Sequence, residues 1–158
     1  MRYLDQIVKQ TQKAVDDICR SAEAVPDDRQ TWTPGEHTRS TLSQMQEVAT
    51  QASWFLPIIK ERSVPDLNSH ARTEFERLRD SYDSVQKCCD AARTSTVELC
   101  QAIAEFPEAK LDEEITLPFG GGMKMTMVDV LGLPYWNMVY HLGQTNQIQL
   151  LLGDLEMH

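Results

Sequence analysis

The chain has 158 residues, of which 41% are hydrophobic and 25% charged, a composition typical of a globular protein with a packed core rather than a disordered chain. Its net charge of -9 argues against nucleic acids and anionic membrane surfaces as partners. No apolar run is long enough to span a membrane, and the amino terminus lacks the apolar core of a signal peptide. We therefore expect one domain over residues 1–158, located in the cytoplasm.

Apolar residues at helical spacing predict two amphipathic helices in the first part of the chain. The first extends from about residue 2 to residue 24. Ser40 is a suitable N-cap for the second, which runs to about Arg62. Pro57 falls inside this helix, where we expect a kink or an early end. Glu47 lies at the edge of the apolar face of the second helix, where a carboxylate can turn inward.

The most regular periodicity runs from Phe75 to Phe106, where apolar residues alternate steps of three and four. It predicts one long third helix with coiled-coil-like packing, closed by Pro107. The connection before it, residues 63–69, is short, and such connections are typical of antiparallel neighbours.

The segment between the third and fourth helices has a different character. Residues 114–119 and 123–127 flank the three glycines 120–122, a pattern that predicts a short hairpin or an extended flap near the mouth of the bundle. A phosphate-binding loop is disfavoured, because no Lys-Ser or Lys-Thr pair follows the glycines. The predicted fold is thus all-α, a four-helix bundle whose long connection between helices 3 and 4 carries a hairpin.

The fourth helix is expected to begin at Thr126 or Asp129 and to end at Gly153, a natural residue after a helix C-cap. Gly132-Leu133-Pro134 should bend or restart it.

Four cysteines are present, and none forms a Cys-x-x-Cys pair: Cys19, Cys88, Cys89 and Cys100. They could form a redox pair or a thiolate site, or they could be small apolar residues of the core. We favour free thiols, because metal-type spacing and an oxidising context are both missing.

A polar patch on a core-directed helix face marks the candidate site. Asn137, His141 and Gln144 stand at i, i+4 and i+7, so they share one face of the fourth helix. Ile148 and Leu151 continue this face as apolar residues, so it points into a core. A buried imidazole or amide without a partner costs about 1–3 kcal/mol. We therefore expect a metal ion, a bound ligand or polar groups of a facing helix beside His141.

Two segments carry motifs of a known family. The first is Trp32-Thr33-Pro34-Gly35, followed by Arg39-Ser40-Thr41-Leu42 and then by Val48, Trp54 and Phe55. The second runs from Asn137 through His141-Leu142-Gly143-Gln144 to Leu151-Leu152-Gly153. They resemble the W-x-P motif before the second helix and the H-x-x-x-H-x-G-Q … L-L-x-x-G signature of the DinB/YfiT family of four-helix-bundle proteins, which are thought to be metalloenzymes.

The resemblance implies a metal site at three positions. The family usually has three histidines there, one from the second helix and two from the fourth, and the matching residues are Glu47, Asn137 and His141. Gln144 would orient a ligand from outside. Only His141 keeps the family residue, although glutamate and histidine are good ligands for zinc, nickel or manganese and an asparagine carbonyl is a weak one. Alternatively, the metal has been lost and Glu47 hydrogen-bonds His141 directly. His37, in the preceding loop, is the only other histidine with a plausible route to the site.

Two classes of function remain open. The resemblance implies a metal-dependent enzyme, of the thiol-dependent S-transferase or isomerase type, that uses a low-molecular-weight thiol as cofactor. The loss of two histidines favours instead a non-catalytic bundle that binds a small molecule or a partner protein. The sequence identifies no catalytic residue and no substrate. A homodimer is expected from the resemblance and from Trp54, Phe55 and Trp136 as exposed apolar candidates.

Overall fold

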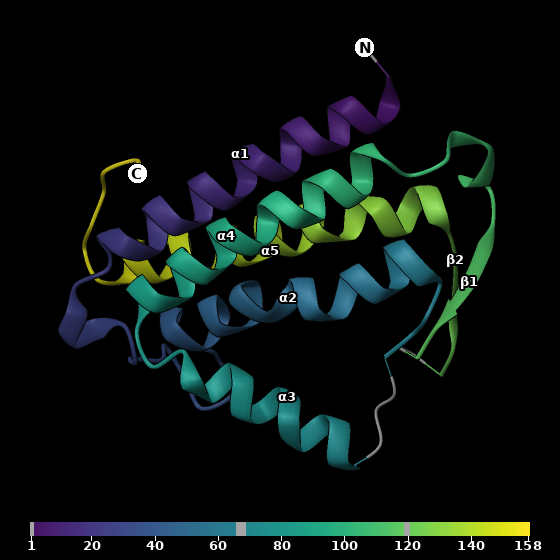
Figure 1. Cartoon of the computed structure of the whole chain (residues 1–158). Coiled ribbons are helices and arrows are strands. Elements are labelled where there is room, and N and C mark those ends of the chain that lie inside the picture. The colour runs from purple at the N-terminus through teal and green to yellow at the C-terminus, as the bar shows by residue number, and fades with distance from the viewer. Residues whose placement is uncertain (1, 66–68, 119–120) are drawn as a thin grey trace.

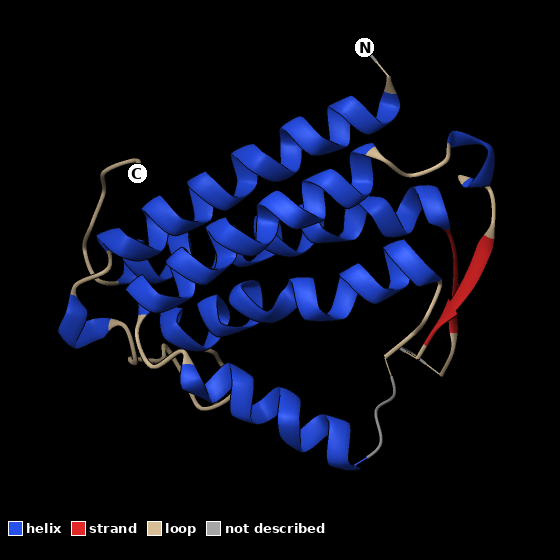
Figure 2. Ribbon diagram, viewed as in Figure 1, coloured by secondary structure: helices blue, strands red, loops and turns tan. Residues whose placement is uncertain are grey.

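The computed structural model describes residues 2–65, 69–118 and 121–158. It is mostly helical, with one two-stranded sheet (Figure 2). In chain order the elements are α1 (Tyr3–Ala24), α2 (Thr41–Glu61), α3 (Ser69–Ser81), α4 (Val85–Ala104), β1 (Glu114–Leu117), β2 (Met123–Thr126) and α5 (Met127–Leu151), with two short 3₁₀ turns at Asp27–Arg29 and Glu108–Lys110. The predicted all-α bundle with a hairpin before its last helix is confirmed.

Four of the helices form the bundle. α1 packs against α4 and α5, and α2 packs against the same two helices, so α1 and α2 lie at opposite corners. Figure 1 shows that α2 and α4 run in the same direction, whereas α1 and α5 run in the other. The chain can join the parallel helices α2 and α4 because α3 runs back along the outside of the bundle.

The prediction of one long third helix is wrong. The chain breaks between α3 and α4, where the Ser84 hydroxyl accepts a hydrogen bond from the Lys87 N–H at 3.3 Å and caps α4. α3 is polar over most of its surface and packs mainly on α2, and Leu78 of the predicted stripe is exposed. The second connection of the bundle is therefore long and contains a helix. Of the segment predicted as a short connection, residues 66–68 lie outside the described part of the chain.

The first, second and last helices have the bounds predicted from the sequence. α1 spans Tyr3–Ala24, and Ser40 caps α2 by accepting a hydrogen bond from the Ser43 N–H. At the end of α5, Gly153 has a φ of 88°, the left-handed conformation expected after a C-cap.

Two prolines lie inside continuous helices. Pro57 does not end α2, which runs to Glu61, and Pro134 does not restart α5. An internal proline costs about 3 kcal/mol in an isolated helix. Here Pro134 is buried in a helix that packs on α1, α2 and β2, and tertiary packing of this kind stabilises a helix more than its local propensity does.

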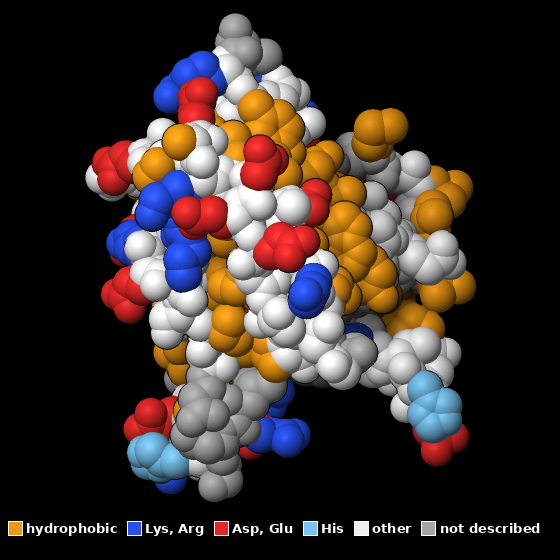
Figure 3. Space-filling view, turned by 90° about the vertical axis from the view of Figure 1, so that its right-hand side faces the viewer, with side chains coloured by type: hydrophobic (Ala, Val, Ile, Leu, Met, Phe, Trp, Pro, Cys, Tyr) orange, Lys and Arg blue, Asp and Glu red, His pale blue; other side chains and the backbone are white. Residues whose placement is uncertain are grey.

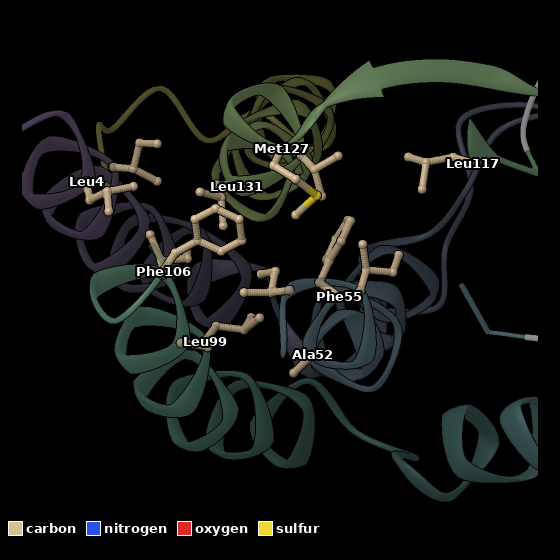
Figure 4. Packing of buried hydrophobic residues seen from close by; sticks show 14 residues of the cluster. Leu4, Ala52, Phe55, Leu99, Phe106, Leu117, Met127 and Leu131 are labelled. Carbon is tan, nitrogen blue, oxygen red and sulfur yellow. The ribbon is translucent and has the colours of Figure 1, made fainter. Parts of the chain in front are cut away.

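The hairpin is attached to one end of the bundle. β1 and β2 pair antiparallel, with Ile115 opposite Met125. Figure 4 shows Leu117 of β1 on the side of Phe55 and Met127, and all three belong to one buried cluster. Of the glycine turn, Gly121 and Gly122 have φ values of 82° and 108°, which favour glycine. Phe119 and Gly120 lie outside the described residues.

The core consists of two apolar clusters along the bundle. One lies at the hairpin end and contains the residues of Figure 4; the other lies toward the opposite end and contains three of the cysteines. All four cysteines are buried free thiols, as predicted. Burial raises the pKa of Cys88 to about 12 and that of Cys100 to about 11, so these thiols stay protonated. Within the described part of the chain, no helix has both the length and the apolar character that a membrane span requires.

Candidate functional site

The centre of the site is a contact between α2 and α5. His141 Nε2 lies 3.1 Å from Glu47 Oε1. The imidazole is almost completely buried, at 1% exposed, whereas the Glu47 side chain is 44% exposed. The two atoms are close enough for an ion pair, but they are not aligned as a hydrogen bond, so Nε2 has no hydrogen-bond partner among the described residues. The contact therefore joins a buried base to a carboxylate that solvent can reach.

The outer atoms of both side chains are held by further partners. His141 Nδ1 lies 3.3 Å from Gln144 Oε1, one turn further along α5, and in this pair Nδ1–H donates to the amide oxygen. Arg39 Nη1 donates to Glu47 Oε2 at 2.5 Å. Arg39 precedes the N-cap of α2, and its side chain lies along the first turns of the helix, where Nη2 also donates to the Ser43 carbonyl at 2.6 Å. His141 Nε2 and Glu47 Oε1 thus face each other and are the inward atoms of the pair, whereas His141 Nδ1 and Glu47 Oε2 are the outer atoms.

The charge of Glu47 is strongly favoured. The contact with His141 lowers the pKa of Glu47 most, and Arg39 lowers it further. Partial burial of the carboxylate has the opposite effect, and the resulting pKa is about 2. The carboxylate is ionised at neutral pH.

A second polar contact lies one helical turn away. Gln51 follows Glu47 by four residues on α2, and Asn137 precedes His141 by four on α5. Asn137 Nδ2 donates to Gln51 Oε1 at 3.3 Å. The two helices therefore carry two successive polar pairs, and Asn137 contacts Gln51 rather than His141.

A large pocket opens beside these pairs. It has a volume of about 980 Å³ and is lined by α2, α3, the hairpin and α5. Arg39, Glu47, Gln51 and Asn137 lie on its wall, and most of the remaining lining is apolar. Pockets of this size hold small organic ligands. The Glu47 carboxylate therefore faces a space in which a small molecule can bind.

The site offers few strong donors for a divalent cation. No group of three or more histidine, cysteine or acidic side chains is placed to hold a metal in the described ranges of the chain. Glu47 and His141 are the two strong donors, and the amide oxygen of Asn137 is the third candidate. Two ligands of one ion at bond lengths of about 2.0–2.2 Å lie roughly 3–3.4 Å apart, and the inward atoms of Glu47 and His141 are 3.1 Å apart. Histidines and carboxylates that bind a metal usually have a further hydrogen-bond partner on the side away from the ion, as Gln144 and Arg39 are here. The spacing of Glu47 Oε1 and His141 Nε2 fits two ligands of one cation, and the described residues place no third strong ligand beside them.

The sequence predicted part of this arrangement. Glu47 and His141 lie together, and Gln144 contacts His141 Nδ1. Their roles as metal ligands and as the residue behind them stay predictions. Sequence reasoning gave no role to Arg39 or Gln51, although Gln51 lies on the same helix face as Glu47. His37 is exposed in the loop before α2.

Of the three apolar residues predicted to be exposed, only Trp136 is, at 59%. Phe55 is buried in the core and Trp54 is half-buried. Phe55 is buried because it shares a face of α2 with the buried residues Val48, Gln51 and Ile58.

Comparisons with known proteins give matches in structure only. No protein-family model matches the sequence, and the search of curated proteins gives no significant match. The structure is similar to YfiT from Bacillus subtilis, described as "a probable metal-dependent hydrolase with an unusual four-helix bundle topology", with a TM-score of 0.75 and 10% identity over 95% of this chain and 87% of that one. It is also similar to the DinB-like protein YjoA from Bacillus subtilis, with a TM-score of 0.59 and 20% identity over 97% of this chain and 96% of that one.

These matches define the class of fold. The chain has the four-helix-bundle fold of YfiT and of a DinB-like protein, over nearly its whole length, in agreement with the resemblance in sequence. At such low identity the likeness extends to the fold alone.

Proposed function

We propose that the chain is a DinB-like metal-dependent enzyme in which Glu47 and His141, with the amide oxygen of Asn137, hold a divalent cation at the wall of the pocket. The observation that carries the proposal is the inward-facing pair of Glu47 Oε1 and His141 Nε2, 3.1 Å apart, with each outer atom already held. The description of YfiT as a probable metal-dependent hydrolase supports the same class of chemistry.

Each residue has a separate task in this proposal. Gln144 accepts a hydrogen bond from Nδ1–H of His141, so a cation would take the place of the proton on Nε2 that faces Glu47. Arg39 fixes Glu47 Oε2, so the carboxylate presents Oε1 to the inside. When bound, zinc, nickel or manganese would lower the pKa of a water or thiol at the site. Hydrolysis and thiol transfer would both use such a nucleophile.

A nucleophilic thiol would come from a second small molecule. All four cysteines of the chain are buried, and none of them lines the pocket. A low-molecular-weight thiol is thus the cofactor that a thiol-dependent S-transferase or isomerase of this fold would require.

The alternative function is a non-catalytic bundle that binds a small molecule without a metal, or a partner protein. The observation that favours it is the ion pair of Glu47 with Arg39, because the guanidinium already compensates the carboxylate. In that case the metal-independent pocket is the functional part of the molecule.

The two alternatives predict different effects of metal on thermal stability. If a metal binds, saturating Ni²⁺ or Mn²⁺ is expected to raise the melting temperature by roughly 5–10 °C, because a ligand at 100 times its Kd stabilises the native state by about 2.7 kcal/mol. Glu47→Gln should abolish the rise. Glu98→Gln, which also removes an acidic partner of a basic side chain but lies on α4 outside the pocket, should retain it. Equal shifts in all three proteins would contradict the proposed site, and no shift in the wild type would favour the metal-free alternative.

A homodimer remains a proposal, supported by an exposed apolar strip on α5. Trp136 and Tyr140 stack with ring centres 5.3 Å apart and are 59% and 51% exposed, and Leu150 and Leu151 are each 54% exposed. Exposed apolar surface of this kind is typical of protein contacts.

Sedimentation at micromolar concentration is expected to give a particle of about twice the 18.0 kDa mass of the chain. Leu150→Lys should shift it to the monomer, because a charge in the strip opposes association. Val97→Lys, at an equally exposed apolar position on α4, should not. A monomeric wild type would eliminate the dimer.

A further inference from the structure

The pocket beside the polar pairs has a lining that indicates its ligand. Apolar side chains come from all four walls, and they include Phe55 and Trp54 of α2, Phe75 of α3, Met123 of β2 and Trp136 of α5. Figure 3 looks onto the hairpin end of the molecule and shows hydrophobic side chains exposed there among charged ones. Aromatic rings and methionines offer a large apolar contact area, and methionine adapts to the shape of its partner. The main part of the ligand must therefore be apolar.

One polar side chain of the wall has an atom without a partner among the residues that the structure describes. Gln51 is 4% exposed and lines the pocket, and its Nε2 has no hydrogen-bond partner among the described residues, while its Oε1 is occupied by Asn137. A buried N–H group without an acceptor destabilises the native state, and few remain in folded proteins. An acceptor oxygen of a ligand in the pocket would complete the hydrogen bonds of this amide.

We infer that the pocket binds an apolar molecule with a carbonyl group, and that Gln51 Nε2 donates a hydrogen bond to the carbonyl oxygen. The inference rests on the proposed function, because it names the substrate class of that site: an ester, amide or thioester with a bulky apolar body. Gln51 is one helical turn from Glu47, so a carbonyl held by Gln51 lies next to the proposed metal ligands. Asn137 fixes the Gln51 amide in this orientation. Gln51 is therefore a substrate-binding residue.

The test compares two molecules of the same size, the ketone hexanophenone and the hydrocarbon hexylbenzene. Their binding to chelator-treated protein is measured by equilibrium dialysis, so the result does not depend on a metal. The wild type is expected to bind both and to prefer the ketone about fivefold, which corresponds to one neutral hydrogen bond. Gln51→Leu should remove this preference and leave hydrocarbon binding in place.

Two controls locate the effect. Gln44→Leu replaces another buried glutamine of α2 that does not line the pocket, and it should keep the ketone preference. Met123→Glu places a charge at an exposed position of the pocket wall, and it should weaken the binding of both molecules. If Gln51→Leu does not fold, Gln51→Glu replaces it, because a carboxylate repels a carbonyl oxygen and should also remove the preference.

The outcomes separate this inference from the proposed metal. Binding of neither molecule by the wild type would overturn the inference, and so would a ketone preference that persists without Gln51. A ketone preference lost only in the Gln51 variants would support it, even if no metal ever binds to Glu47 and His141.

Discussion

Replacing Leu99 by alanine is expected to lower the free energy of unfolding by about 2–5 kcal/mol. Leu99 is 0% exposed and lies on α4 in the cluster at the hairpin end, where Figure 4 shows it among side chains of the neighbouring helices. Its removal loses apolar burial and leaves a cavity that rigid helices on several sides fill only partly. Urea unfolding followed by circular dichroism measures the change.

Val97→Ala is the matched control for this prediction. Val97 lies on the same helix two residues earlier and is 69% exposed, so its truncation should change the free energy by less than about 0.5 kcal/mol. If Leu99→Ala cost no more than Val97→Ala, the packing of α4 at this end of the bundle would be refuted.

His141→Ala is expected to lower the free energy of unfolding by about 2–4 kcal/mol in metal-free protein. Alanine leaves a cavity where the buried ring stood, and the side chains of Glu47 and Gln144 lose their common partner. This cost does not require a metal, because it comes from packing and polar contacts of the chain itself. The same urea titration measures it.

His37→Ala provides the comparison, since His37 is exposed in a loop and its removal should be nearly neutral. A loss below about 1 kcal/mol in His141→Ala would show that the imidazole is not the buried link between α2 and α5.

The bundle helices could be predicted from the sequence because periodicity and caps agree there. Ser40 and Gly153 mark ends of α2 and α5 that the structure places at the same positions. The break between α3 and α4 was not predicted, because steps of three and four continue through residues 82–84 without a glycine or proline. Ser84 was the available signal, since it is a good N-cap within an apparent helix. Apolar spacing identifies a helix face but does not identify a change in chain direction.

The candidate site could be predicted only where its residues follow a helix period. Asn137, His141 and Gln144 share a face of α5, and the resemblance to a family connected them with Glu47. The contacts of Arg39 with Glu47 and of Gln51 with Asn137 depend on how the loop before α2 folds back and how α2 and α5 pack. Neither contact leaves a recognisable pattern in the local sequence. The pocket was not predicted, because α3 forms one of its walls and the apolar periodicity predicted α3 and α4 as a single helix.

The central claim is that Glu47 and His141 together hold a divalent cation. The most direct measurement is elemental mass spectrometry of untagged protein after equilibrium dialysis against zinc, nickel or manganese, with Glu47→Ala and His141→Ala alongside. The account predicts about one ion per chain in the wild type and little or none in either variant. A wild type that binds no ion, or variants that bind as much as the wild type, would contradict it.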